Sequence, residues 1–160
     1  MCLDRLETFK PCTVGYKIIY RDYCNKRFYR FLIKGYGSFL PKIWLNESSY
    51  RYPGDGETLP LELGNDSNFT YPIGFHICHT IAGAIVHFRK FGFTDSILVK
   101  VKIRQAVATG YQFGHKVTVA KEMYIIKEIH TFKTFSIEEL NSIVKVEKWK
   151  GIIPKLRNKD

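Results

Sequence analysis

The sequence predicts an α+β fold: a single domain spanning residues 1–160, with a curved, mostly antiparallel sheet of about five strands, one central helix and a short C-terminal helix. Three observations support this class. One segment, 80–91, carries apolar residues at helical spacing, and several other segments alternate between apolar and polar residues as strands do. The chain is 45% hydrophobic and 15% aromatic over 160 residues, which suffices for one core.

The beginning of the chain is predicted to hold an irregular arm and a hairpin. Residues 1–14 lack periodicity, and Pro11 discourages regular structure near the end of this arm. Residues 16–21 and 27–33 are rich in aromatic and β-branched residues, which favour strands. The connection 22–26 contains Asp and Asn, which suit a turn, so we expect the two segments to pair.

Residues 35–73 are the least regular part of the chain. Frequent Gly and Pro residues leave room only for short elements such as 38–45, and most of the charged residues in this stretch are acidic. Loops of this length are uncommon in compact domains and are often functional. Two interpretations stay open: a lid or partner-binding arm, or an insertion that covers an edge of the sheet.

The predicted central helix has a signal at each end. Thr80 is placed to cap its first turn, and Gly92 follows two cations where a left-handed residue commonly ends a helix. Residues 75–79 alternate and predict a short strand that leads into the helix. The apolar face of the helix consists of Ile81, Ala84, Ile85, Phe88 and Phe91.

Two strands and a second helix are predicted after the central helix. Residues 97–104 alternate, with Ile and Val on one face and cations on the other. A connection at 105–115 separates this strand from a long strand at 116–129. Residues 136–139 fit a capping box that begins the short C-terminal helix, and residues 145–160 form a basic tail.

The net charge of +10 favours polyanionic partners such as nucleic acid or a ribonucleoprotein. Charge alone leaves open that the protein is basic without such a partner. Cations and tyrosines interleave on the predicted hairpin, as on surfaces that stack the bases of single strands, although ordinary strand packing would give the same pattern. The candidate nucleic-acid-binding residues are Arg21, Arg27, Arg30, Lys100, Lys102 and Arg104, with Tyr16, Tyr20 and Tyr29 as stacking rings.

Side chains suited to catalysis are concentrated around the start of the central helix. A zinc site needs at least three converging ligands, and alternation sends His79 away from the face shared by His76 and Cys78, so we expect no metal site. The common nucleotide-binding and catalytic motifs are absent, so an enzyme is the less favoured class and we expect no cofactor. An alternative small-ligand site would use His76, Tyr111 and His115.

The sequence also bears on compartment. It has no apolar run of about 18 residues and no apolar segment near residue 1, so we expect neither a membrane span nor a signal peptide, and no membrane partner. The four cysteines show no paired spacing and are expected to be free thiols. The expected location is the cytoplasm, which is the host cell cytosol if the protein is viral.

Three short motifs follow one another along the chain. They are Gly74-Phe75-His76 before the helix, Val99-Lys100-Val101 in the next strand, and a strand from Lys116 to Ile129 that ends in Lys-Glu-Ile. Their order, over roughly residues 15–130, resembles a group of small uncharacterised domains encoded by bacteriophages, bacteria and large DNA viruses. The resemblance implies a viral or mobile-element accessory protein and brings no catalytic residues with it. The Gly-aromatic-His step before a helix is also similar to ADP-ribosyltransferase folds.

These observations and the resemblance lead to one predicted function. We expect a phage or mobile-element accessory protein that engages nucleic acid or a nucleoprotein complex, with inhibition of a host defence system as one role that it would serve. Two alternatives stay open: an enzyme that acts on a nucleotide or NAD, or an inhibitor that binds a host protein through the acidic stretch 35–73.

Overall fold

A computed structural model gives the structure of the chain and describes residues 3–21, 27, 29–30, 39–50, 58–60, 70–91 and 96–132. The main sheet contains β1 (Arg5–Leu6), β2 (Val14–Arg21), β3 (Tyr29–Arg30), β4 (Trp44–Asn46), β7 (Phe75–Cys78), β8 (Ser96–Gln112) and β9 (His115–Phe132). The other elements are the 3₁₀ helix η1 (Glu47–Tyr50), the paired strands β5 (Thr58–Pro60) and β6 (Thr70–Pro72), and the helix α1 (Ile81–Phe91).

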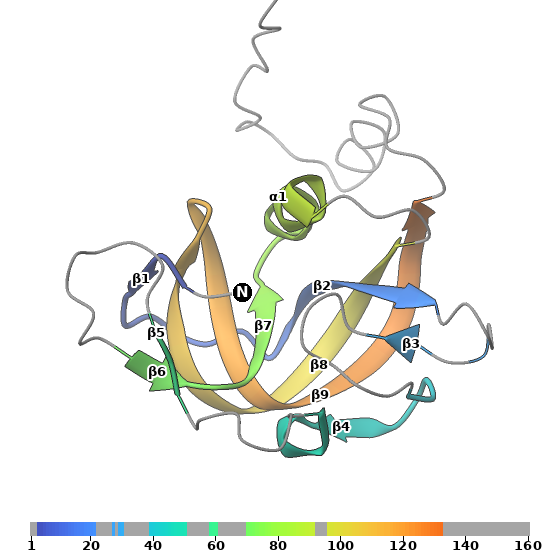
Figure 1. The fold of residues 1–160 in the computed structure, drawn as a ribbon, viewed down its shortest axis with the longest axis horizontal. Coiled ribbons are helices and arrows are strands. Elements are labelled where there is room, and N and C mark those ends of the chain that lie inside the picture. The colour runs from blue at the N-terminus through green and yellow to red at the C-terminus, as the bar shows by residue number, and fades with distance from the viewer. Residues whose placement is uncertain are drawn as a thin grey trace, which may run out of the picture.

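The main sheet has seven strands in the order β1, β8, β2, β7, β9, β4, with β3 paired to β2 (Figure 1). Every pairing is antiparallel, as expected. Strands dominate the described part of the chain, and α1 is the single α-helix in that part. The prediction of an α+β fold with about five strands and a central helix is therefore wrong, and the described chain is mainly β.

β8 and β9 form one long hairpin, which accounts for much of the difference. A connection was predicted at 105–115, but β8 continues through this segment to Gln112. Phe113 and Gly114 make the turn with φ angles of 51° and 76°, the left-handed geometry of a tight two-residue hairpin turn. Phe113 donates its backbone N–H to the carboxylate of Asp4 over 2.5 Å, which helps to hold this bulky residue in a rarely adopted conformation.

Four strands close into a ring. β8 pairs with β2 and β9, and β7 pairs with the same two strands, so the order β2, β7, β9, β8 returns to its start. All four strands contribute to a core cluster that fills the ring, and its members Ile19, Ile77, Val99 and Met123 are fully buried. The sheet therefore has an inner surface, which is core, and an outer surface.

β8 bends at Gln105, whose φ of 53° is left-handed. Three consecutive residues, Arg104, Gln105 and Ala106, are exposed there, so the alternation of buried and exposed positions is interrupted. The register with β9 also shifts between Ala106 and Ala108, as at a β-bulge. This irregularity accompanies the strong curvature of β8 and β9 that Figure 1 shows.

The predicted helix is confirmed as α1, but it lies on the outer surface of the ring. The hydroxyl of Thr80 caps it by accepting an N–H of the first turn over 3.2 Å. Its buried residues Ile81 and Ile85 pack with Ile18 and Leu98 in a second core cluster. Figure 1 shows α1 just beyond the end of β7. Because the ring surrounds a core of its own, the helix covers the sheet and does not organise it.

The N-terminal arm is more ordered than predicted. Leu3 is fully buried, and its backbone N–H donates to the hydroxyl of Tyr71 over 2.7 Å. β1 pairs with β8 beside Gly110, where a Cβ atom would overlap the carbonyl oxygen of Arg5. A strand of two residues carries no periodic signal, which explains why an irregular arm was predicted at 1–14.

The other predicted elements have mixed outcomes. The strand at 75–79 is confirmed as β7, and the described parts of the hairpin 16–21 with 27–33 form β2 and β3. The predicted C-terminal helix, the basic tail 145–160 and most of the acidic stretch 35–73 lie outside the described residues.

Gly15 allows β2 to pass close to β7. A Cβ atom at this position would lie 2.5 Å from Cγ2 of Ile77 and 2.7 Å from the carbonyl oxygen of Cys78. We predict that Gly15→Ala lowers the free energy of unfolding by about 1–3 kcal/mol, because a clash with a backbone oxygen needs a strand to shift. Urea denaturation measures this change. Thr13→Ala, at an exposed position, is the control, and equal losses in both variants would contradict the close approach.

Lys17 is a cation inside the ring. It shares a face of β2 with the core residue Ile19, and its Nζ donates to the carbonyl oxygen of His76 over 3.1 Å. Burial lowers the pKa of Lys17 to about 8. The residue as a whole keeps some contact with solvent, so water screens part of the cost of burying this charge.

We predict that Lys17→Met raises the free energy of unfolding by about 1–3 kcal/mol at neutral pH, since the variant buries no ammonium group. Between pH values of about 8 and 10.5 the unfolded wild type binds more protons than the folded protein, so wild-type stability rises through this window and the advantage of the variant shrinks. Urea denaturation across the window measures both effects. Lys10→Met, at an exposed cation, is the control, and a pH-independent advantage of Lys17→Met would contradict the buried ammonium.

Candidate nucleic-acid interface

Three of the predicted cations lie in a row on the outer surface of the ring. Lys100, Lys102 and Arg104 alternate along β8 with residues that fill the ring, so the pleat of the strand directs all three outward. Lys102 and Arg104 are exposed and Lys100 is half-buried. Neighbours in this row are two residues apart, which is about 6.6–6.8 Å on a strand. The structure therefore brings these three predicted residues together.

β9 adds a fourth cation that was not predicted. Lys127 is exposed and lies directly opposite Lys100 in the register of β8 with β9. In the same register Tyr124 lies opposite Lys102. Opposed residues of antiparallel strands share a face, so Lys127 and Tyr124 extend the row of β8 sideways by one strand spacing, about 4.7–4.9 Å.

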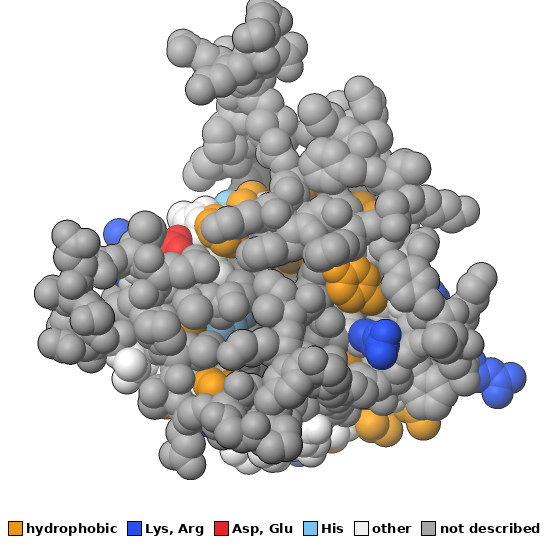
Figure 2. All heavy atoms as spheres, viewed as in Figure 1, with side chains coloured by type: hydrophobic (Ala, Val, Ile, Leu, Met, Phe, Trp, Pro, Cys, Tyr) orange, Lys and Arg blue, Asp and Glu red, His pale blue; other side chains and the backbone are white. Residues whose placement is uncertain are grey.

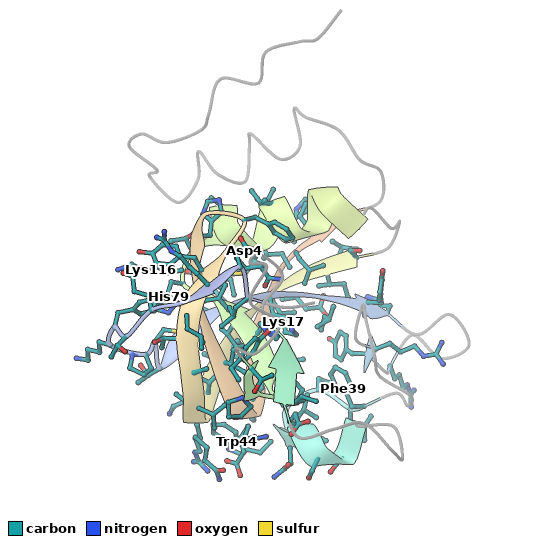
Figure 3. The ribbon with its side chains drawn as sticks, turned by 60° about the vertical axis from the view of Figure 1, so that its left-hand side comes forward. Asp4, Lys17, Phe39, Trp44, His79 and Lys116 are labelled. Atoms are coloured by element: carbon teal, nitrogen blue, oxygen red, sulfur yellow. The ribbon has the colours of Figure 1, made fainter. Side chains whose placement is uncertain are left out.

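An aromatic pair borders these cations. Trp44 of β4 lies opposite Tyr124, and their ring centroids are 5.6 Å apart. The guanidinium carbon of Arg104 lies 3.9 Å from the centroid of the Trp44 ring, a cation–π contact that positions Arg104 without neutralising its charge. Figure 3 labels Trp44 at the lower edge of the sheet. We define the basic face as Lys100, Lys102, Arg104, Lys127, Tyr124 and Trp44.

The basic face carries an excess of positive charge. No ion pair joins any of its four cations to a carboxylate among the residues that the structure describes. One carboxylate, that of Glu122, lies opposite Arg104 and accepts a hydrogen bond from the amide of Gln105 over 3.2 Å. Four positive charges therefore face one negative charge on this part of the sheet.

The members of the basic face that were not predicted depend on pairing between distant segments. Lys127 and Tyr124 come into register with β8 only when 105–115 forms part of a hairpin, and a connection was predicted there. Trp44 joins them because β4 pairs with β9. Alternation in the predicted strand 116–129 did place Tyr124 on the other face from the apolar residues, and this was the sequence signal for its outward position.

Two predicted residues of the hairpin face the core. Arg21 forms an ion pair with Glu128 over 2.6 Å, and the hydroxyl of Tyr29 donates to the same carboxylate. Burial, together with this carboxylate, raises the pKa of Tyr29 to about 12. Tyr29 is a member of the core cluster inside the ring, so its ring is covered.

The remaining hairpin residues are divided between two places. Tyr16 lies opposite Lys100 and borders the basic face. Tyr20 lies four residues after Tyr16 on β2, which is about 13 Å along the strand, and it pairs with the exposed Arg30. Arg27 is exposed in the connection between β2 and β3. Figure 2 shows that the described cations visible in its view occupy separate places on the surface.

The three residues of the alternative small-ligand site are not brought together. His76 is buried, and its Nε2 lies 2.9 Å from a buried tyrosine hydroxyl. Its partner on β9 is Val119, four residues or about 13 Å from His115. Tyr111 points to the opposite face of β8 from Gln112, the residue that pairs with His115.

A polar cluster that was not predicted joins the N-terminal segment and the end of β7 to β9. The hydroxyl of Thr118 lies 2.8 Å from Nε2 of His79 and accepts the backbone N–H of Cys12 over 3.2 Å. Burial lowers the pKa of His79, and burial raises the pKa of Cys12. Burial also raises the pKa of Cys78 to about 12, so neither free thiol is suited to nucleophilic attack. Within the described ranges, three or more potential metal ligands do not gather at one place.

We predict that Tyr29→Phe lowers the free energy of unfolding by about 0.5–1.5 kcal/mol, because Glu128 loses a part-buried hydrogen bond and keeps its ion pair with Arg21. Affinity for a single-stranded oligonucleotide should stay unchanged, since Tyr29 lies in the core. Urea denaturation and fluorescence anisotropy measure the two quantities. Tyr124→Phe, which removes a hydroxyl on the basic face, is the control, with a stability change within about 0.5 kcal/mol. A loss of affinity in Tyr29→Phe at full stability would show that its ring reaches the ligand.

Comparison with known proteins assigns no family. No protein-family model, curated protein or solved structure matches the chain. Across the described residues, the structure contains no helix with the length and apolar content that a membrane crossing requires. The similarity to domains of phages and large viruses stays a prediction, and the basic face is the observation that bears most directly on function.

Proposed function

We propose that the protein binds nucleic acid, either free or within a nucleoprotein complex, through the basic face. The observation that carries this proposal is the alignment of Lys100, Lys102 and Arg104 on β8 with Lys127 on β9. These cations have no ion pair with the described carboxylates, so their charge is available to a ligand.

The spacing of the cations suits a polyanion. They repeat at about 6.6–6.8 Å along β8 and at about 4.7–4.9 Å across to β9. Each phosphate that a cation neutralises releases condensed counterions, so several modest contacts add up to a large and salt-dependent affinity. With four cations and one carboxylate, this face attracts phosphates before any contact is made.

The aromatic residues of the basic face favour a single strand over a duplex. Trp44 and Tyr124 are half-buried, so each residue keeps some exposure to solvent beside the cations. Unpaired bases can stack on such rings, whereas the bases of a duplex are stacked on one another. Arg104 already stacks on Trp44, and a base that packs against this pair would meet a guanidinium plane and an indole together.

The wider role belongs to the same proposal. As a phage or mobile-element accessory protein, the chain would use the basic face to engage a host nucleic acid or nucleoprotein complex and so inhibit a host defence system. An enzyme acting on a nucleotide or NAD receives less support, because His76, Tyr111 and His115 lie apart. An inhibitor acting through the acidic stretch 35–73 would depend mostly on residues outside the described part.

We predict that replacing Lys100, Lys102 and Lys127 together by Gln weakens binding of a fluorescent single-stranded oligonucleotide at least about tenfold at low salt. The slope of log affinity against log salt concentration should be about −3 for wild type and about −1 for the variant, because each single-strand phosphate contact contributes about −0.7. Fluorescence anisotropy titrations across a salt series measure both quantities.

Lys10→Gln is the matched control for this experiment, since Lys10 is an exposed cation outside the basic face and its loss should leave the slope nearly unchanged. The proposal fails if wild type does not bind at low salt, or if the triple variant binds as tightly as wild type.

A further inference from the structure

Two polar side chains lie beside the aromatic pair of the basic face. On β4, Asn46 comes two residues after Trp44, and Leu45 between them is buried in the core of the ring, so Asn46 and Trp44 both project outward. Asn46 lies opposite Glu122 of β9. The outer surface therefore carries an aromatic row and, about 6.6–6.8 Å further along the strands, a polar row.

The side-chain amide of Asn46 has a fixed orientation. Its Oδ1 accepts the backbone N–H of Ser48 over 3.0 Å and the hydroxyl of Ser48 over 2.7 Å. Because a backbone N–H can only donate, the amide oxygen must be the atom that is turned toward Ser48. The amide nitrogen Nδ2 donates to no residue within the described ranges. Asn46 is exposed, so this donor can meet a ligand in solvent.

Glu122 supplies an acceptor next to this donor. Among the described residues its carboxylate accepts one hydrogen bond, from Nε2 of Gln105 to Oε1 over 3.2 Å. A carboxylate has two oxygens and about four acceptor positions, so this contact holds the group in place and leaves most of its acceptor capacity open. The neighbouring Arg104 stacks on Trp44 and forms no ion pair with Glu122.

We propose that Asn46 and Glu122 make the basic face select guanine in a single strand. This inference rests on the function proposed above and names the base that the same face prefers. The Watson–Crick edge of guanine presents the acceptor O6 and the donors N1–H and N2–H side by side. Nδ2 of Asn46 and the two carboxylate oxygens of Glu122 offer the complementary order of one donor and two acceptors. Proteins that read single strands commonly bind this edge of an unstacked base.

The other bases match this order less well. Adenine and cytosine each carry a ring-nitrogen acceptor where guanine carries N1–H, and a carboxylate repels such an acceptor. Thymine and uracil have one donor between two carbonyl oxygens. A base that stacks on Trp44 and Arg104 would be held beside the polar row. Asn46 and Arg104 are exposed and Glu122 is half-buried, so the base stays on the surface of the sheet and no part of the core has to open.

The experiment uses the full chain and short fluorescent oligothymidines whose central nucleotide carries guanine, adenine or hypoxanthine. In anisotropy titrations at low salt, the guanine strand should bind at least about fivefold more tightly than the adenine strand. Hypoxanthine keeps O6 and N1–H but lacks the N2 amino group, so its affinity should lie between the two. Equal affinities for guanine and adenine would overturn the inference and leave the proposed function intact, whereas no binding of any strand would overturn both.

Glu122→Gln tests the carboxylate at nearly constant size. The preference for guanine over adenine should fall below about twofold. Affinity for the adenine strand should rise, because the variant removes a negative charge beside the cations. Unchanged preference in Glu122→Gln would overturn the inference.

Asn46→Asp tests the donor, since it keeps an oxygen for Ser48 and removes Nδ2. It should also lower the preference for guanine. Glu7→Gln, at an exposed carboxylate of the N-terminal arm, is the matched control and should keep the wild-type preference. A loss of preference in Glu7→Gln as large as in Glu122→Gln would show that the effect is not specific to the polar row and would overturn the inference.

Discussion

The fold depends on how closely β2 can approach β7. The two strands meet where Tyr16 pairs with Cys78, and the adjacent Gly15 has no side chain to hold them apart. This contact closes the ring, because β8 and β9 already connect the other sides of β2 and β7. A ring with a filled interior then decides where every other side chain goes. Residues of one parity become core, and residues of the other parity must find a cover or meet solvent.

The outer surface is divided between a covered part and an exposed part. Ile18 and Leu98 lie under α1, and both are buried. Tyr16 lies two residues before Ile18 on β2, and Lys100, its partner, lies two residues after Leu98 on β8. Both are half-buried and mark the beginning of the exposed part. The same alternation therefore places Leu98 beneath the helix and Lys100 beyond it. The basic face thus needs no special structure, because it is the uncovered continuation of a surface whose other part supports the helix. The ion pair of Arg21, in contrast, belongs to the inner side.

Local patterns could be predicted from the sequence, and contacts between distant segments could not. The helix at 80–91 and the row from Lys100 to Arg104 were predicted because each repeats with the period of its own element. The hairpin of β8 and β9 was missed because Phe113 adopts a left-handed conformation that its residue type does not suggest. For the same reason, the sequence did not predict that Lys127 lies beside Lys100 or that Gln112 pairs with His115. Both pairings follow only from the register of β8 with β9.

The contacts of Lys17 have a consequence for the start of the chain. Its ammonium group holds the carbonyl of His76, the imidazole of His76 meets the hydroxyl of Tyr71, and that hydroxyl accepts the backbone N–H of Leu3. A series of polar contacts therefore connects Lys17, inside the ring, with Leu3 in the N-terminal arm. A change that pulls Leu3 from its place would break the first of these contacts, so we expect the burial of Leu3 to help hold Tyr71 and β7 in position.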